Sequence, residues 1–107
     1  MGKFNEAKFE NKYVHYLTEL QRAYRKAFEV MNERRDSGLV HAIDQQVLNE
    51  SEPFFEGTEA DPVFRVELPP EPYDRLSGVV VAEEQFEAVL DEYVNELEAA
   101  LEAEFFN

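Results

Sequence analysis

The chain has 107 residues, enough for one domain whose core buries roughly two-thirds of the unfolded surface. Hydrophobic residues make up 44% of the chain, which excludes global disorder despite the high charge. The sequence contains no cysteine, so disulfide bonds and thiol chemistry are excluded. No apolar run approaches the ~18 residues of a membrane span, and the first residues lack the apolar core of a signal peptide. We therefore expect a single cytoplasmic domain over residues 1–107 that does not enter a membrane.

The charge balance is strongly acidic, because 24 acidic side chains against 10 basic ones give a formal net charge of -14. Mutual repulsion on this scale weakens a folded state in dilute salt and matters less in molar salt, which screens it. The acidic side chains are scattered through every segment of the chain. This distribution favours a halophilic protein over a surface that imitates nucleic acid.

A long amphipathic helix is predicted from Glu6 to about Arg35, with Asn5 as its N-cap. Its apolar side chains recur at steps of four and three, and the face is Phe9, Tyr13, Tyr16, Leu20, Tyr24, Ala27 and Met31, with Val14, Leu17 and Phe28 beside it. A helix of this length spans on the order of 45 Å at ~1.5 Å per residue, more than the width of a globule of this size. We expect it to protrude or to pack against a second copy, and residues 1–5 to form a frayed lead-in.

A second, shorter helix is predicted after the break at residues 36–38. Gly38 ends helices, and Asp36 and Ser37 start them by accepting hydrogen bonds from free amides. The apolar residues Leu39, Ile43 and Val47 follow at helical spacing, and the polar run at 49–53 stops the helix. The two helices form either a hairpin or one bent helix.

A β-hairpin is predicted next, from residues 54–56 and 63–68 with a loop longer than the tight two-residue turns. In its second strand Phe64, Val66 and Leu68 share one face, as in a half-buried antiparallel strand. The run Val79 to Val81 is a possible third short strand, since two-stranded ribbons are marginal alone.

The last helix is predicted from about Glu83 to Phe105, since its first turn is acidic. Its apolar face repeats at four and three: Phe86, Leu90, Tyr93, Leu97, Ala100 and Leu101. The matching period of the first helix predicts that the two long helices pack on each other. The expected fold is therefore α+β, consisting of a long helix, a shorter helix, a β-hairpin and a long C-terminal helix.

The sequence contains few residues in patterns typical of catalytic or metal-binding sites. His15 with Glu19, and His41 with Asp44 or Gln45, supply too few ligands for a specific metal site. No phosphate-binding glycine loop, zinc-protease motif or nucleophile elbow occurs. We therefore expect no enzyme activity, no metal and no cofactor.

The basic residues gather in the first helix. Residues 1–36 carry eight of the ten basic side chains and six acidic ones, a net charge of +2 against -16 for the remainder. The side chains of this segment suited to phosphate contact are Tyr16, Arg22, Tyr24, Arg25, Lys26, Arg34 and Arg35. The favoured interpretation is that these bases pair with the acidic C-terminal helix, and nucleic-acid binding is the alternative.

Three stretches carry a resemblance to known proteins: residues 36–56 (DSGLVHAIDQQVLNESEPFFE), 65–69 (RVELP) and 73–81 (YDRLSGVVV). In these the chain resembles a small family of haloarchaeal proteins of unknown function. The resemblance supports the halophilic interpretation. It implies no activity, ligand or site residue.

The polar run around Gln45, Gln46 and Asn49 carries more amide groups than a second helix needs for packing, and these groups suit a partner's backbone. The alternative is a solvated helix face. The function we expect is a small protein-interaction or regulatory module, acting by surface recognition as a homodimer or a subunit. The alternative function is a nucleic-acid-associated regulator that uses the basic side of the first helix.

Overall fold

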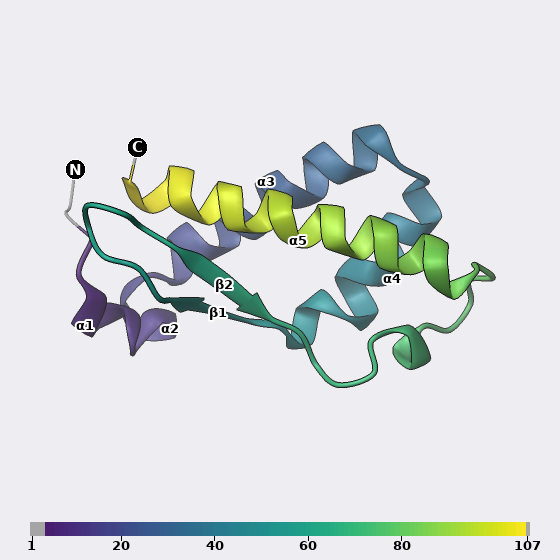
Figure 1. Ribbon diagram of the computed structural model, residues 1–107, viewed down its shortest axis with the longest axis horizontal. Coiled ribbons are helices and arrows are strands. Elements are labelled where there is room, and N and C mark those ends of the chain that lie inside the picture. The colour runs from purple at the N-terminus through teal and green to yellow at the C-terminus, as the bar shows by residue number, and fades with distance from the viewer. Residues whose placement is uncertain (1–3, 107) are drawn as a thin grey trace.

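The computed structural model describes residues 4–106. The helices are α1 (Glu6–Phe9), α2 (Lys12–His15), α3 (Leu17–Arg34), α4 (Ser37–Gln46) and α5 (Glu83–Phe106), with short 3-10 helices η1 (Leu48–Glu50) and η2 (Tyr73–Arg75) and strands β1 (Glu52–Phe55) and β2 (Phe64–Glu67). Helices α3 and α5 pack along each other, and the hairpin packs on α5 through β2 (Figure 1). This arrangement confirms the predicted α+β fold and the packing of the two long helices.

The prediction of one continuous helix from Glu6 to Arg35 is wrong. Asn11 (φ -116, ψ 47) and Tyr16 (φ -130, ψ 22) leave helical geometry and divide the segment into α1, α2 and α3. The breaks bring the rings of Phe9 and Tyr16 onto Phe105, at centroid distances of 5.6 and 5.0 Å. Packing of aromatic rings thus outweighs helix propensity, which differs by only tenths of a kcal/mol per residue.

The broken helix fits inside the molecule. The 18 residues of α3 span about 27 Å at ~1.5 Å per residue, whereas the principal extents of the molecule are 43 × 26 × 22 Å. No part of α3 needs to protrude or to find a second copy because of its length. The argument for a homodimer that rested on helix length therefore falls away.

Helix α4 begins where the sequence predicts a break. The carboxylate of Asp36 accepts a hydrogen bond from the backbone N–H of Leu39 at 2.9 Å, which caps the helix. The chain reverses after α3, and α4 packs back against it (Figure 1). Of the two arrangements left open by the sequence, the structure forms the helical hairpin.

The β-hairpin has the predicted inward face. Its strands are antiparallel, with Pro53 opposite Val66 and Phe55 opposite Phe64. Phe64 and Val66 are buried, while Leu68 beyond the strand is half-buried. The backbone N–H of Val66 donates to the carboxylate of Glu98 at 3.0 Å, so α5 covers the outer edge of β2.

The hairpin loop depends on a glycine. A Cβ atom on Gly57 would lie 2.2 Å from the carbonyl oxygen of Asp61 and 2.5 Å from the backbone nitrogen of Val63. Both atoms belong to the backbone of the returning chain and cannot move aside without opening the turn. Glycine is therefore required at this position.

The third strand considered for Val79 to Val81 does not form. The sheet of the described residues consists of β1 and β2 alone. Gly78 turns the chain through positive φ (78). The hydroxyl of Tyr73 then donates to the carbonyl of Val81 at 2.6 Å, and Val80 is fully exposed. The segment therefore leads into α5 and does not pair with the hairpin.

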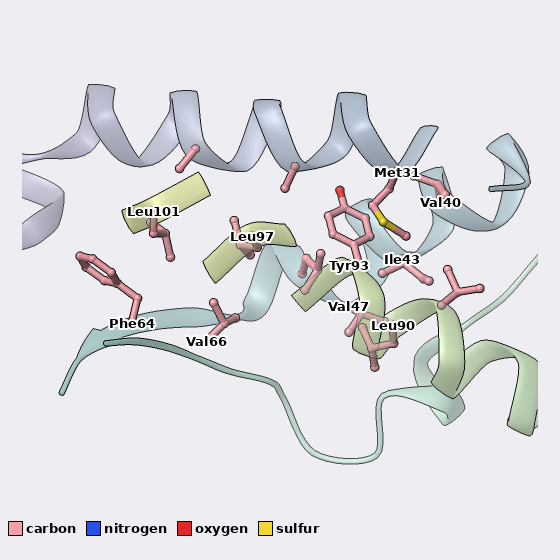
Figure 2. Packing of buried hydrophobic residues seen from close by; sticks show 14 of the residues in the cluster. Met31, Val40, Ile43, Val47, Phe64, Val66, Leu90, Tyr93, Leu97 and Leu101 are labelled. Atoms are coloured by element: carbon pink, nitrogen blue, oxygen red, sulfur yellow. The ribbon is translucent and has the colours of Figure 1, made fainter. Parts of the chain in front are cut away.

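The main core lies between α3, α4, α5 and the hairpin. Tyr93 on α5 lies beside Met31 and Ile43, and Leu97 and Leu101 continue the same face toward the hairpin (Figure 2). All five side chains are at most 1% exposed. The predicted apolar face of the last helix is thus confirmed.

At one end of the molecule the core continues into a cluster of aromatic rings. It consists of the rings of Phe4, Phe9, Tyr16, Phe55, Phe64, Phe105 and Phe106. Phe4 has its centroid 4.7 to 6.0 Å from the other six rings and is 7% exposed. The expectation of a frayed lead-in is therefore wrong for Phe4. Asn5 caps α1 as predicted, accepting from the N–H of Lys8 at 3.1 Å, and residues 1–3 lie outside the described part.

The substitution Asp44→Asn is expected to stabilise the fold at neutral pH. Burial raises the pKa of the Asp44 carboxyl group, although the charge of His41 opposes this rise. A raised folded-state pKa means that ionisation costs more in the folded than in the unfolded chain, so the stability falls as the pH rises through this range. The advantage of the amide should be present at pH 7 and should vanish below the ordinary aspartate pKa of about 3.9.

Urea unfolding of both chains between pH 3 and pH 7 measures this difference. The matched control is Asp91→Asn, because Asp91 is exposed. A wild-type chain more stable than Asp44→Asn at pH 7 would contradict the prediction.

Candidate functional site

A groove opens on the surface where α2 and α3 meet η1 and β1. We call it the α3–η1 groove; it encloses about 220 Å³, and its apolar wall is Tyr13, Leu17, Leu20, Leu48 and Pro53, while its polar atoms come from Gln21, Tyr24, Asn49 and Ser51. None of these side chains carries a charge at neutral pH, in a chain with a net charge of -14. The α3–η1 groove is therefore an uncharged apolar site on an acidic protein.

The break before α3 leaves apolar side chains at this site exposed to water. Tyr13 is 54% exposed and Leu17 46% exposed, and the neighbouring Val14 is 80% exposed. A straight helix would have carried Tyr13 on the same face as the buried Leu20. Tyr13 and Leu17 thus form an apolar rim that the molecule does not cover.

The polar groups at the floor of the groove are satisfied within the chain. The hydroxyls of Tyr24 and Ser51 are hydrogen-bonded at 3.0 Å, and Ser51 also donates to the carbonyl of Leu48 at 2.6 Å. Burial raises the pKa of Tyr24 to about 12, so the phenol stays neutral at physiological pH. The amide groups of Gln21 and Asn49 are exposed at the rim. They are available to a ligand's polar atoms.

Lys12 holds Tyr13 at the mouth of the groove. Its ammonium nitrogen lies 2.9 Å from the carboxylate of Glu52 and within 5.1 to 5.3 Å of the ring centroids of Phe9, Tyr13 and Phe54. Such a cation over aromatic faces is attracted to each ring. The lysine is 4% exposed, so it ties α2 to β1 from inside.

The acidic residues beside the groove are neutralised. Glu52 pairs with Lys12, and Glu50 pairs with Arg75 at 2.8 Å. On the other side, Arg25 lies one helical turn after Gln21, is exposed, and has no ion-pair partner among residues 4–106.

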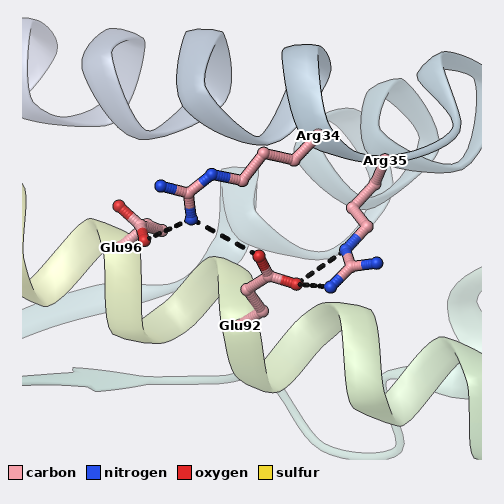
Figure 3. A network of polar contacts seen from close by, with 4 residues as sticks. All are labelled: Arg34, Arg35, Glu92 and Glu96. Carbon is pink, nitrogen blue, oxygen red and sulfur yellow. Dashed lines mark hydrogen bonds and ion pairs between the residues drawn. The ribbon is translucent and has the colours of Figure 1, made fainter.

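Three of the four arginines predicted to contact a partner pair with α5. Arg35 holds Glu92 at 2.7 Å, and Arg34 lies 2.9 Å from Glu96 and 3.5 Å from Glu92 (Figure 3). Arg22 holds the carboxylate of Glu104 at 2.8 Å near the other end of the helix pair. The structure thus shows the pairing of basic α3 with acidic α5 that the sequence favoured.

These ion pairs are expected to contribute little to stability. Arg34 and Arg35 are about half exposed, and exposed pairs contribute at most about 1 kcal/mol each. The double substitution Arg34→Gln/Arg35→Gln should lower the free energy of unfolding by less than about 2 kcal/mol in dilute salt, and by less in molar KCl. Urea titrations at the two salt concentrations measure it. A loss that grows with salt would contradict a screened surface pair.

The other predicted residues divide between structural and exposed positions. Tyr16 accepts a hydrogen bond from the N–H of Asn5 at 3.0 Å within the aromatic cluster. The amide of Gln46 bonds the backbone of Ser77 twice, donating at 3.1 Å and accepting at 2.7 Å. Gln45 is exposed on α4. Of the predicted residues, only Tyr24 and Asn49 line the α3–η1 groove.

Residues 4–106 hold no group of three or more His, Cys, Asp or Glu side chains placed to bind a metal ion. His15 is exposed on α2, and the Nδ1 atom of His41 lies 2.9 Å from the carbonyl oxygen of Ser37. Within the same residues, no helix has the length and the apolar character needed to cross a membrane.

Sequence reasoning missed Tyr13 and Leu17 as surface residues, because it placed both on the helix face that packs inside. A signal was present in the width of that face. With Val14, Leu17 and Phe28 beside the main apolar row, the segment offers more apolar area than one packed helix contact uses. Part of this additional apolar area, on Tyr13 and Leu17, is exposed at the groove.

These features define an α+β protein in which two long helices pack with a short hairpin, and α2, α3, η1 and β1 line an apolar surface groove. A family model described as "Family of unknown function (DUF5783)" matches residues 1–107, so the chain belongs to this family. The match confirms the predicted relationship to a family of unknown function. The haloarchaeal part of that expectation stays a prediction. No curated protein and no solved structure matches the chain.

Proposed function

We propose that this protein is a protein-interaction module that works by surface recognition and not by catalysis. The observation that carries the proposal is the α3–η1 groove, which is apolar, uncharged and rimmed by the exposed Tyr13 and Leu17. Exposed apolar side chains gathered at one site mark contact surfaces, because their burial against a partner removes apolar area from water.

The size of the groove favours a protein side chain over a metabolite. Its volume of about 220 Å³ is below the roughly 300–1,000 Å³ typical of small-molecule sites. An anchoring apolar side chain of a partner needs less space, and such anchors in pockets dominate the energy of protein interfaces. The proposed occupant is accordingly an apolar side chain of another protein chain.

Nucleic-acid binding has less support. The guanidinium groups of Arg22, Arg34 and Arg35 are already held by carboxylates of α5. A phosphate would have to displace these carboxylates against the field of a chain with net charge -14. Arg25 alone gives a weak electrostatic footprint. We further propose that the protein is cytoplasmic and that its host is a halophile. The acidic charge of the chain supports the halophilic host.

Site-specific photo-crosslinking in the cells that make the protein tests the proposal. A photoreactive p-benzoylphenylalanine replaces Leu17 at the rim of the groove, and in a matched control it replaces Val80, which is exposed outside the groove. A discrete adduct from position 17 and none from position 80 is expected. The purified partner should then bind the wild-type chain and the Val80→Arg variant but not Leu17→Arg.

Because Leu17 is nearly half exposed, Leu17→Arg should change the free energy of unfolding by no more than about 0.5 kcal/mol. A loss of binding together with a native circular dichroism spectrum therefore supports the groove. Equal adducts from both positions, or no adduct from position 17, would overturn the proposal. An adduct with the mass of two chains would identify the predicted homodimer as the interacting form.

A further inference from the structure

We infer that the partner of the α3–η1 groove also places an arginine side chain in a second pocket, which lies beside the groove between α1, α2 and β1. This inference rests on the proposed function and adds the charge of the partner to it. We call the second site the α1–β1 pocket; it encloses about 240 Å³ and is lined by Glu6, Phe9, Glu10, Lys12, Glu52, Phe54 and Phe55.

The α1–β1 pocket and the groove are neighbours. Lys12 lines the pocket, and the next residue, Tyr13, lines the groove. On β1, Glu52 and Phe54 line the pocket, while Pro53 between them lines the groove. Helices α1 and α2 lie beside β1 at this end of the molecule (Figure 1). Because consecutive residues line the two sites, one segment of a partner can occupy both.

The α1–β1 pocket carries negative charge that this chain does not neutralise. Lys12 pairs with Glu52, but Glu6 and Glu10 are exposed and have no ion-pair partner among residues 4–106. Glu10 continues the helical geometry of α1, so the two carboxylates stand one helical turn apart, where like charges repel each other. A bound cation would relieve this repulsion, and the net charge of -14 attracts a basic partner.

A lysine of this chain shows that the groups of the pocket hold a cation. The ammonium nitrogen of Lys12 lies 2.9 Å from the carboxylate of Glu52 and 5.3 and 5.1 Å from the ring centroids of Phe9 and Phe54. This combination of a carboxylate with aromatic faces stabilises the ammonium group although the lysine is only 4% exposed. Phe55, which is half-buried, adds a further ring to the lining.

Arginine fits the pocket better than other cations. Its planar guanidinium group can donate to two carboxylates at once, as Glu6 and Glu10 provide, and its face stacks on an aromatic ring. A metal ion is a poorer occupant, because residues 4–106 contain no group of three or more ligands placed to bind one. The partner is therefore expected to carry an arginine close to the apolar side chain that enters the groove.

Titration of the full-length protein with N-acetyl-L-argininamide, followed by two-dimensional NMR of the backbone amides, tests the inference. The titration uses the lowest KCl concentration at which the circular dichroism spectrum is native, so that charges are screened least. The amide signals of Glu10 and Phe55 should shift to saturation. The uncharged analogue N-acetyl-L-citrullinamide should leave them in place, and this comparison needs no variant.

Two double variants locate the binding. Glu6→Gln/Glu10→Gln should weaken argininamide binding about fivefold or more, because it removes both unpaired carboxylates of the pocket. Glu29→Gln/Glu33→Gln removes two exposed carboxylates at the same spacing from α3, outside the pocket, and should leave binding unchanged. The partner captured through position 17 should respond to the two double variants in the same way.

The outcomes separate this inference from the proposed function. Equal shifts with both ligands, or none with either, would overturn the arginine site. Equal weakening by the two double variants would show a general attraction to an acidic chain and would overturn it as well. Neither result affects the groove, which the crosslinking at Leu17 tests. A specific argininamide response without an adduct from position 17 would overturn the proposed function, and with it the partner that joins the two sites.

Discussion

Replacement of Phe4 by alanine is expected to lower the free energy of unfolding by about 3–5 kcal/mol, the usual cost of removing a buried phenylalanine. Phe4 is 7% exposed, and its ring contacts residues from α1, α5 and both strands, among them Phe9, Phe55 and Phe106. Loss of the ring would leave a cavity where these elements meet. Because the rings also interact edge to face, the cost should lie above that of lost area alone.

Urea unfolding followed by circular dichroism in molar KCl measures this effect. Phe4→Leu keeps most of the volume and should cost less than the alanine variant. Val80→Ala is the control, since Val80 is fully exposed, and its cost should stay within about 0.5 kcal/mol. A Phe4→Ala chain as stable as the Val80→Ala chain would show that the first residues are frayed after all.

The sequence contained a signal for Phe4 that the helical periodicity did not reveal. With Asn5 as the N-cap of α1, Phe4 stands at the position before the cap and Phe9 at the fourth helical position. Apolar residues at these two places pack on each other as a hydrophobic staple, and the two ring centroids are 5.5 Å apart. The partners Phe105 and Phe106 lie about a hundred residues away, and only the folded chain brings them there.

Other features could be predicted because local pattern and tertiary packing agree. Phe64 and Val66 alternate with charged residues along β2, and both are buried. The apolar row of α5 recurs at three and four residues and packs against α3 and β2. The breaks at Asn11 and Tyr16 were not predicted, because no Gly or Pro marks them and the apolar residues keep helical spacing across them.

In the candidate site, too, one feature could be predicted from the sequence and another could not. The pairing of α3 arginines with α5 glutamates follows from two opposite charge patterns of equal period, and the structure contains it in the contact of Arg34 with Glu96. The groove depends on where η1 and β1 meet α3, which involves residues more than twenty positions apart. Tyr24 was predicted as a phosphate contact of the first helix, and Asn49 as an amide that binds a partner's backbone. Their proximity is a property of the helical hairpin.

The second large effect is expected from salt. Seven of the 24 acidic side chains take part in ion pairs among residues 4–106: Glu50, Glu52, Glu56, Glu67, Glu92, Glu96 and Glu104. The remaining carboxylates repel one another over about 30 Å in 0.01 M salt but over only about 3 Å in 1 M salt. Dilution should therefore destabilise the fold, even though the ion pairs themselves become stronger.

We expect the free energy of unfolding to fall by about 2 kcal/mol or more between 1 M KCl and dilute buffer, which lowers Tm by about 10 °C for a domain of this size. A matched variant reduces the repulsion by amide substitution at four exposed positions of α5: Glu84→Gln, Glu87→Gln, Asp91→Asn and Glu102→Gln, which takes the net charge from -14 to -10. Its Tm should depend less on salt than that of the wild-type chain. Circular dichroism melts that coincide at both salt concentrations would show that ion pairs and core packing outweigh the net charge. If the variant and the wild type instead shift equally, the salt effect arises from apolar burial, which concentrated salt also strengthens, and not from repulsion.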